Sequence, residues 1–458
     1  MIFKTIIQYL KEVIRKMFSR DEMRRVTAEE VTLSDEMVKR IELWDQMLKG
    51  KAPWLVDGMG NRYNSMQLES AICAEFANIS LVEMEWDVTD EQLQLLCEPA
   101  IDALNENLQK GLALGSLVIK PIGATGDYEF VTEDNIIPIE FDGGGNLKSV
   151  AFVEIRPYGD YDVYYRVETH RLSNEGLEIQ NRAFKGTKNN IGNPVSLDAF
   201  EDWATLPEDV LFPGMDKMDF GYYKNPIPNT IDNSANGVSI YEKAVEHIKM
   251  ADIQNSRLDW EFESAERMVF ADYTTVQKTS EGWRNPVNRK RLIVGADIDK
   301  SDSMDTYNPE IREQNFINGI NEYLRMIERD CCLAYGDLSK NEQIEKTATE
   351  ILASRKRKYY RVTAIQKALK TCLEGFVDAV AFYSGKYTTG YEATFNFHDS
   401  IMTDEETERA QDRIDMSAGI MSPVEYRMKW YGEDEATATQ AIANAMNINA
   451  AMSQAPIE

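Results

Sequence analysis

Acidic side chains are the most abundant chemically active groups in this sequence, and composition alone explains their clustering. The chain has 77 Asp and Glu residues against 50 Lys and Arg residues, which gives a formal charge of −27. Neighbouring carboxylates, as in Asp404-Glu405-Glu406 and Glu433-Asp434-Glu435, could serve as the acid and base of a glycosidase. In so acidic a chain such neighbours arise by chance, so their spacing identifies no catalytic site.

Histidine and cysteine are too few and too dispersed for metal or nucleophilic chemistry. The three histidines have no second metal-type ligand at a helical or turn spacing. The five cysteines include the adjacent pair Cys331-Cys332 but no Cys-x-x-Cys, which is typical of reduced thiols in a cytosolic setting. The motifs GxxxxGK[ST], GxSxG and HExxH are also missing. The sequence therefore predicts a protein that is not an enzyme and has no metal and no cofactor.

Basic residues gather in three places against this acidic background, and these places are the candidate binding sites. A protein that grips DNA usually carries a broad basic face, which this chain lacks. A few positive charges instead suit a surface along which DNA slides without being bound tightly. The alternative is that each cluster is a solvated helix face or forms ion pairs between subunits. The clusters are Lys340 and Lys346 with Asn341; Trp283 with Arg284, Arg289, Lys290 and Arg291; and Arg355, Lys356, Arg357 and Lys358.

The first half of the chain predicts helices followed by strands. Residues 32–117 have a helical period, with Met37, Ile41, Trp44 and Leu48 on one face. Residues 115–186 alternate with a period of two and predict short strands, with Gly143-Gly144-Gly145 as a hairpin turn. Residues 187–236 are predicted to be irregular.

Three long helices dominate the second half. They are expected from Ser239 to Met268, from Pro309 to Tyr335 and from Thr347 to Phe382, with Ser239 as an N-cap and Pro309 in a first turn. Residues 269–307 lie between the first two helices and contain strand candidates at 268–272 and 290–295. This stretch is too short for a large core of its own, so we expect a projecting tip that neighbours in an oligomer stabilise. A strand at 391–399 and further helices follow.

The first eighteen residues have the pattern of a basic amphipathic helix, with apolar positions opposite Lys4, Lys11, Arg15 and Lys16. Such a helix can lie on a membrane surface, but we favour docking on its own domain or on a neighbouring subunit. Charges interrupt the apolar stretch, so no signal peptide is expected. No run of eighteen apolar residues occurs, so no membrane span is expected either.

Five stretches, in this order and spacing, resemble the portal proteins of long-tailed phages, particularly those of Gram-positive hosts. They are Ile41-Glu42-Leu43-Trp44 with Gly50 and Pro53-Trp54; residues 228–252 with Gly237-Val238-Ser239; Tyr307-Asn308-Pro309-Glu310-Ile311-Arg312; Lys346-Thr347-Ala348-Thr349-Glu350-Ile351; and residues 395–400 with 418–422. One departure is Cys331-Cys332-Leu333-Ala334-Tyr335-Gly336, where the family commonly has a Gly-Leu-Ser-type step.

The resemblance implies an α+β portal fold with a mixed α/β wing, a stem of long helices, a small α/β clip and a helical C-terminal crown. Carried over by position, the parts are an N-terminal amphipathic helix (1–31), the wing (32–236), the first stem helix (237–268), the clip (269–307), the second stem helix (308–335), a tunnel loop (336–346), a wing helix and strand (347–402) and the crown (403–458).

The resemblance also implies a function without catalysis. Typically twelve subunits form a ring through which double-stranded DNA is packed and ejected. The implied partners are the terminase large subunit, a head-completion or connector protein, and the major capsid and scaffold proteins. The implied location is the capsid portal vertex of the virion, after assembly in the host cytoplasm. The tunnel-loop residues Lys340, Asn341 and Lys346 would lie nearest DNA. The alternative expectation is an assembly scaffold at a membrane surface or in the cytoplasm.

Overall fold

The computed structural model describes residues 20–56, 62–158, 162–187, 190–265, 268–271, 278–279, 282–283, 292–294, 304–307, 309–340, 348–397 and 405–453. Between 268 and 307, and at 348–354, 405–408 and 445–453, it describes the backbone alone. The chain divides into two compact units, Met1–Asn396 and Phe397–Glu458, and each is described by itself. The structure is mixed α and β, which is compatible with the predicted α+β class. The amphipathic helix predicted over the first eighteen residues lies outside the described residues.

The first unit begins with a layer of short helices. They are α2 (Arg20–Thr27), α3 (Asp35–Leu48), α4 (Leu68–Leu81), α5 (Glu91–Asp102) and α6 (Leu104–Leu114). Ser34 caps α3 by accepting a hydrogen bond from the Met37 backbone N–H. The predicted face of α3 is confirmed for Met37, Ile41 and Trp44, which are fully buried. It is wrong for Leu48, because Met47 occupies the last core position, one turn after Trp44.

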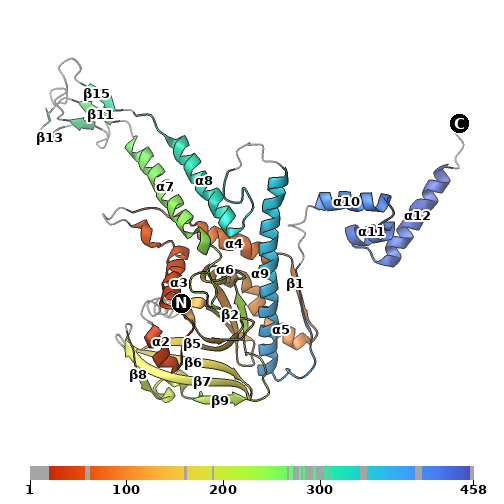
Figure 1. Cartoon of the computed structure of the whole chain (residues 1–458), viewed down its shortest axis with the longest axis horizontal. Helices are drawn as coiled ribbons and strands as arrows, with labels where there is room; N and C mark the ends of the chain where they lie inside the picture. Colours follow the sequence, from red (N-terminus) through yellow and green to blue (C-terminus); the bar gives the residue numbers. More distant parts are fainter. Residues whose placement is uncertain are drawn as a thin grey trace. The chain divides into compact units, whose positions relative to one another are not determined.

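Two antiparallel sheets follow these helices (Figure 1). A three-stranded sheet has the order β10-β2-β3, and a six-stranded sheet has the order β4-β5-β6-β7-β8, with β9 paired to β7. The predicted glycine turn is confirmed, because Phe141 pairs with Leu147 on either side of it. The strands are β2 (Ser116–Ile122), β3 (Asp127–Thr132), β4 (Ile136–Phe141), β5 (Leu147–Tyr158), β6 (Asp162–Ser173), β7 (Gly176–Thr187), β8 (Asn190–Val195), β9 (Asp209–Phe212) and β10 (Gly221–Lys224).

The prediction that residues 187–236 are irregular is wrong in three places, where β8, β9 and β10 form. These strands are short. β8 pairs with the strand just before it, β7, whereas β9 and β10 depend on more distant partners. β10, for example, pairs Tyr223 with Leu117 of β2. Another unpredicted strand, β1 (Met84–Val88), lies within the region of predicted helical periodicity and pairs with β16 (Ala393–Phe397). Local pattern cannot show such pairings, because they are made by residues far apart in the chain.

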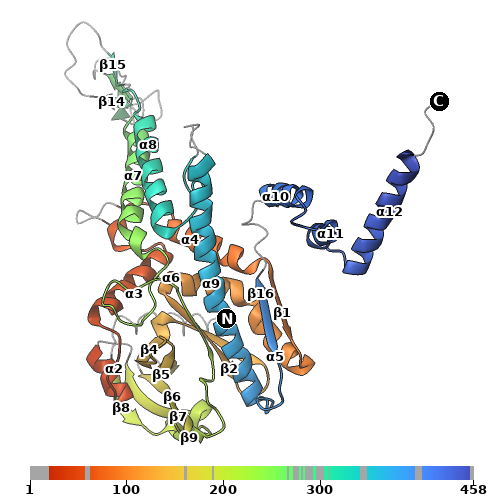
Figure 2. The same cartoon turned by 45° about the vertical axis from the view of Figure 1, so that its right-hand side comes forward.

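A helical hairpin leaves this body (Figures 1 and 2). It consists of α7 (Val245–Ser264) and α8 (Glu313–Cys331), both shorter than predicted. Residues before Val245 pack into the base of the hairpin as turns and a short 3-10 helix, so Ser239 is not the N-cap of α7. α8 starts at Glu313 instead of Pro309. The backbone N–H and the guanidinium of Arg312 donate to the Glu261 carboxylate of α7, and these bonds hold Arg312 in a non-helical conformation.

Short strands lie between the two hairpin helices in the chain. A small sheet has the order β14-β11-β15, formed by β14 (Leu292–Val294), β11 (Met268–Ala271) and β15 (Met304–Tyr307). A second pair is β12 (Lys278–Thr279) with β13 (Gly282–Trp283). Both strand candidates predicted in this stretch are therefore confirmed.

The 36-residue helix α9 (Ala348–Tyr383) runs back along the body and packs on β10, β2 and α4. Its prediction is within one residue at each end. Its apolar side, including Ile365, Leu369 and Phe376, is almost completely buried. Among the described residues, no helix is both long and apolar enough to cross a membrane.

The hairpin is joined to the body where two glycines touch. A Cβ atom on Gly115, which has a φ of +109°, would lie 2.6 Å from the backbone carbon of Gly237. This approach excludes any larger residue, so the Gly-x-Ser segment singled out in the sequence owes its glycine to backbone packing. Asn225 secures the same point by donating its side-chain amide to the carbonyls of Leu112 and Val238, each at 2.8 Å.

The second unit is helical, as predicted. It contains α10 (Glu405–Ser417), α11 (Pro423–Tyr431) and α12 (Glu435–Ser453). α11 begins with a capping box. The Ser422 hydroxyl accepts a hydrogen bond from the Glu425 backbone N–H, and the Glu425 carboxylate accepts one from the Ser422 backbone N–H.

Candidate functional site

The loop that follows α8 is held by one buried carboxylate. This carboxylate belongs to Glu328, whose side chain has no solvent exposure. Its Oε1 accepts backbone hydrogen bonds from Gly336, Leu338 and Ser339 at 3.1, 2.8 and 2.7 Å, and its Oε2 accepts from the Ser339 hydroxyl at 3.0 Å. These charge-assisted bonds also explain why α8 ends at Cys331 rather than at the predicted Tyr335, because the following N–H groups turn back to Glu328.

A second anchor fixes the end of this loop at Lys340. The Lys340 backbone N–H donates to the side-chain oxygen of Asn321 at 2.7 Å, and the Asn321 amide donates to the Lys340 carbonyl at 3.4 Å. The Lys340 side chain is exposed. The structure thus holds the backbone of this predicted site residue and leaves its charge at the surface. Asn341 and Lys346, predicted for the same loop, lie outside the described residues.

The basic cluster at the start of α9 separates into exposed and buried members. Arg355 and Lys356 are exposed, and Arg357 stacks on Tyr335 with its guanidinium 5.5 Å from the ring centroid. Lys358 is buried, and its amine contacts Glu75 of α4 at 2.6 Å and Asp337 of the loop at 2.9 Å. Lys358 therefore ties the loop to the body within one chain.

We expect the Lys358→Met substitution to lower the free energy of unfolding by about 1–2 kcal/mol, because it leaves Glu75 and Asp337 without their shared cation. Chemical denaturation measures the effect. Lys356→Met is the matched control, since the side chain two positions earlier is exposed, and it should change the free energy by less than about 0.5 kcal/mol. Equal effects of the two substitutions would contradict an anchoring role for Lys358.

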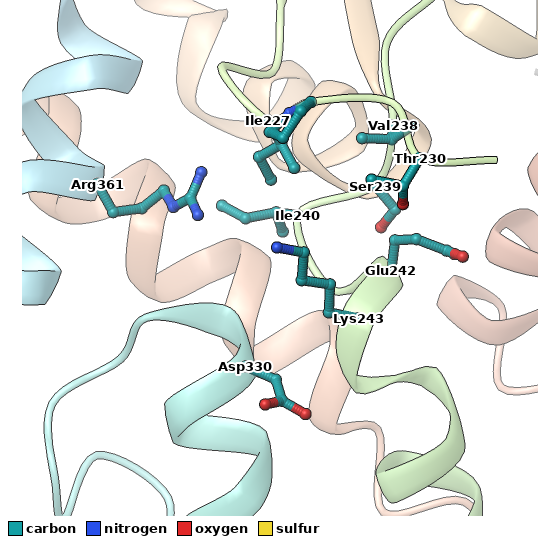
Figure 3. Close-up of a pocket in the computed structure, with 10 residues that line it drawn as sticks. Ile227, Thr230, Val238, Ser239, Ile240, Glu242, Lys243, Asp330 and Arg361 are labelled. Carbon is teal, nitrogen blue, oxygen red and sulfur yellow. The ribbon is translucent and has the colours of Figure 1, made fainter. Parts of the chain in front are cut away.

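A small hollow marks the base of the hairpin (Figure 3). Its volume of about 10 Å³ matches a single water molecule. Lys243 approaches it from the segment before α7, Asp330 from α8 and Arg361 from α9. Arg361 donates to the Pro226 carbonyl at 3.2 Å, and Asp330 contacts His247 at 2.9 Å. The groups around the hollow join α7, α8 and α9, and the space is too small for an organic ligand.

A buried charged network lies between the two sheets. His170 of β6 is 1% exposed, and its Nδ1 lies 2.7 Å from Asp219 while its Nε2 lies 3.0 Å from Glu168. Lys120 of β2 contacts Glu168 at 2.8 Å, and Tyr383 of α9 donates to Asp219 at 2.5 Å. Glu168 and His170 share a face in the predicted period-two pattern, which was the only available signal. Asp219 comes from the stretch predicted to be irregular.

The electrostatics of this network favour the charged forms of Lys120, Glu168, His170 and Asp219, because their pKa values shift toward ionisation. Burial opposes protonation of His170, but the negative charge of Asp219 and the hydrogen bonds to Asp219 and Glu168 raise the pKa to about 9. Burial likewise opposes ionisation of Glu168, yet the Lys120 charge and the His170 hydrogen bond hold its pKa well below its usual range. A histidine with both ring nitrogens bound to carboxylates is an imidazolium that has no free nitrogen with which to accept a proton.

A cleft of about 920 Å³ opens beside this network, between β3 and the exposed face of β5, β6 and β7. Its polar lining consists mainly of groups already bonded to each other. Arg166, for example, contacts Glu154 at 2.7 Å, Glu168 at 3.2 Å and Asn181 at 2.9 Å. The cleft walls are therefore lined by ion pairs, those of Arg166 within the six-stranded sheet and that of Lys120 with Glu168 between the two sheets, and they leave few free donors for a ligand.

The remaining predicted site residues lie between the hairpin helices. Trp283 belongs to β13, of which the backbone alone is described, and Arg284, Arg289, Lys290 and Arg291 lie outside the described residues. Among the described residues, no group of three His, Cys, Asp or Glu side chains could hold a metal ion. All five cysteines are free thiols. In the comparisons with known proteins, no family model and no curated protein matches the chain.

Proposed function

We propose that this chain is the portal subunit of a tailed bacteriophage, and that it forms a ring channel for packaging and ejecting double-stranded DNA. One observation carries the proposal. A helical hairpin with small strands between its helices leaves a mixed α/β body, and an anchored loop and one long helix follow it in the chain. This is the order of stem, clip, stem, tunnel loop and wing helix that the sequence resemblance implies.

Under this proposal α7 and α8 form the stem, the strands β11 to β15 belong to the clip, α9 crosses the wing and α10 to α12 belong to the crown. The ring would hold about twelve copies. The clip would dock the terminase large subunit during packaging and a head-completion or connector protein afterwards. The major capsid and scaffold proteins would surround the wing at the portal vertex of the virion.

The charge of the chain suits a channel that lets DNA move. A formal charge of −27 per subunit repels phosphates, so DNA does not adhere to the wall. Sparse cations such as Lys340 can centre the duplex without holding it, because each phosphate contact adds only a salt-dependent increment of affinity. The chemistry of packaging, which needs ATP hydrolysis, would come from the terminase.

The double anchoring of the loop gives it a mechanical role in this proposal. Glu328 and Asn321 fix residues 336–340 to α8, and Lys358 connects Asp337 to α4. A force on the loop would pass directly into the stem helix and the body. Such a connection suits a loop that contacts moving DNA and transmits its position to the rest of the subunit.

The test is the native mass of the purified full-length chain, together with negative-stain images of the same sample. We expect a hollow ring of about twelve subunits of 52.3 kDa each. The sample should also be mixed with vesicles of anionic lipid and floated. A dimer that forms no ring, alone or coexpressed with capsid and scaffold proteins, would contradict the proposal, and flotation with the lipid would favour a membrane scaffold.

A further inference from the structure

All four basic residues of the unit Phe397–Glu458 gather in one place. The unit has twelve acidic residues, yet Arg409 and Arg413 of α10 and Arg427 and Lys429 of α11 surround the same aromatic side chains. The rings are those of Tyr426, Trp430 and Tyr431. Cations spread by chance over an acidic unit would not converge in this way. We call Arg409, Arg413 and these three rings the Arg–aromatic edge.

Two of the four cations are already neutralised within the unit. Arg427 forms a two-point ion pair with Glu433 at 2.6 and 2.7 Å, and Lys429 contacts Asp412 at 2.7 Å. Arg409 and Arg413 have no carboxylate partner among the residues whose side chains the structure describes. Among the side chains that the structure describes, the positive charge of the unit that lacks a carboxylate partner therefore lies on these two arginines.

The two arginines point at the same atom. Arg409 Nε and Arg413 Nε donate to the Tyr426 hydroxyl oxygen at 3.2 and 3.1 Å. They lie one turn apart on α10, a spacing at which like charges repel. A phenol oxygen only partly offsets this repulsion, whereas a carboxylate would offset it fully and would match the fork geometry of a guanidinium. Arg413 is exposed, so a carboxylate from outside the unit can reach it.

The same unit also has an acidic surface, away from these arginines in the sequence. A shallow hollow of about 710 Å³ lies along the start of α12, with an acidic rim and a floor of small residues. Asp434 is engaged in capping, because its Oδ1 accepts the Thr437 backbone N–H at 3.2 Å. The Glu435 side chain is exposed and has no bonding partner among the described residues. The hollow is lined by Asp434, Glu435, Ala436, Thr439, Gln440 and Ala443.

We propose that the Arg–aromatic edge of one copy binds the Glu435 hollow of a second copy of this chain. Arg409 and Arg413 take the Glu435 carboxylate, and the exposed Tyr431 ring packs on the small residues of the floor. The edge and the hollow are different surfaces, so the contact is head-to-tail and each copy uses both. This contact rests on the proposed ring, in which it joins neighbouring subunits through their C-terminal units.

An acidic protein segment fits the edge better than a nucleic acid does. The unit has eight more acidic than basic residues, so its field repels a polyanion. Nucleic acids are bound by extended basic surfaces that neutralise several phosphates at once. Two arginines that lack a carboxylate partner among the described side chains match a single carboxylate, and the surface that offers one is present in every copy.

The experiment uses charge reversal in the full-length chain, with assembly measured by mass photometry over a concentration series. Arg413→Glu and Glu435→Arg should each raise the concentration needed for half-assembly at least tenfold. The double variant R413E/E435R restores the opposite charges in swapped positions and should return to within about threefold of the unmodified chain. Lys370→Glu, an exposed reversal on α9 with the same change in net charge as Arg413→Glu, should leave assembly unchanged.

The outcomes separate this contact from the proposed ring. If the unmodified chain forms rings and both single reversals assemble normally, the contact is overturned and the ring stands. A double variant that is worse than either single variant also overturns it. If the unmodified chain never assembles, the proposed function fails first. If Arg413→Glu loses its helical circular dichroism, Arg413→Gln and the solvent-exposed Glu435→Arg carry the test. Binding of a 30-base-pair duplex that is lost in R409Q/R413Q would overturn the assignment in favour of nucleic acid.

Discussion

The His170→Leu substitution is expected to lower the free energy of unfolding by about 3–5 kcal/mol at pH 6. The imidazolium lies between the carboxylates of Asp219 and Glu168 and is fully buried. Leucine fills a similar volume but leaves Asp219 as a buried anion with only the Tyr383 hydroxyl and the more distant Lys120 charge to stabilise it. Urea denaturation followed by circular dichroism measures the loss.

The effect of this substitution should depend on pH in a definite direction. The folded pKa of His170, about 9, lies above the ordinary value of 6.5, so the proton stabilises the folded state. This contribution is complete below pH 6.5 and is lost as the pH rises through about 9. The difference between the two proteins should therefore shrink by about 3 kcal/mol between pH 6 and pH 9.5. Asp219 and Glu168 have lowered pKa values and stay ionised throughout this range.

Two further variants test this explanation. His247→Leu removes the other histidine paired with an aspartate, but that side chain is 28% exposed, so the cost should stay near 1 kcal/mol or less. In H170L/D219L both charges of the buried pair are replaced by apolar groups, and the double variant should be more stable than H170L alone. A constant difference between pH 6 and pH 9.5 would show that His170 is not charged in the folded protein.

The Glu328→Ala substitution is the second change with a large expected effect, a loss of about 3–4 kcal/mol of unfolding free energy. Three backbone N–H groups and one hydroxyl lose their shared buried acceptor, and hydrogen bonds to a charged group contribute about 1.5–3 kcal/mol each. The estimate is below their sum because part of the loop can turn its N–H groups to water. Chemical denaturation gives the global effect.

Amide hydrogen exchange reports on the loop itself. Gly336, Leu338 and Ser339 donate to Glu328, so their amides should exchange much faster in the alanine variant. Glu322→Ala is the matched control on α8, because that carboxylate is 57% exposed and makes one ion pair, with Arg325 at 3.4 Å. It should cost less than about 0.5 kcal/mol and leave the loop amides protected. Unchanged exchange in E328A would contradict the anchoring.

Elements with a long local pattern could be predicted, and elements made by distant partners could not. The span of α9 followed from its apolar period, and β11 and β14 followed from short β-branched runs. β10 has only four residues and exists because Tyr223 pairs with Leu117 across the chain. The start of α8 was misplaced because Arg312 is held by Glu261, a contact between two elements that local sequence does not reveal.

The candidate site residues show the same distinction between those that local composition marks and those that packing alone defines. Charge against an acidic background identified Lys340 and the cluster at Arg355, which lie at the surface. It could not show that Lys358 is buried, because a basic run on a helix turns some members inward. Composition could not show that Glu328 is buried, since an acidic residue among 77 has no feature that distinguishes it from the exposed ones. The Arg–aromatic edge was hidden because its two arginines lie on α10 and its three rings lie on α11, and only the packing of these helices brings them together.

The contact between Gly115 and Gly237 has a consequence for how the molecule can vary. The chain leaves the helical body at the first glycine and returns at the second, so everything between them is an insertion whose two ends touch. The six-stranded sheet lies deep within this insertion, and its loops can lengthen or change their surface without moving the base of the hairpin. The two glycines mark the border between these loops, whose lengths do not affect the contact, and the helices whose positions the contact fixes.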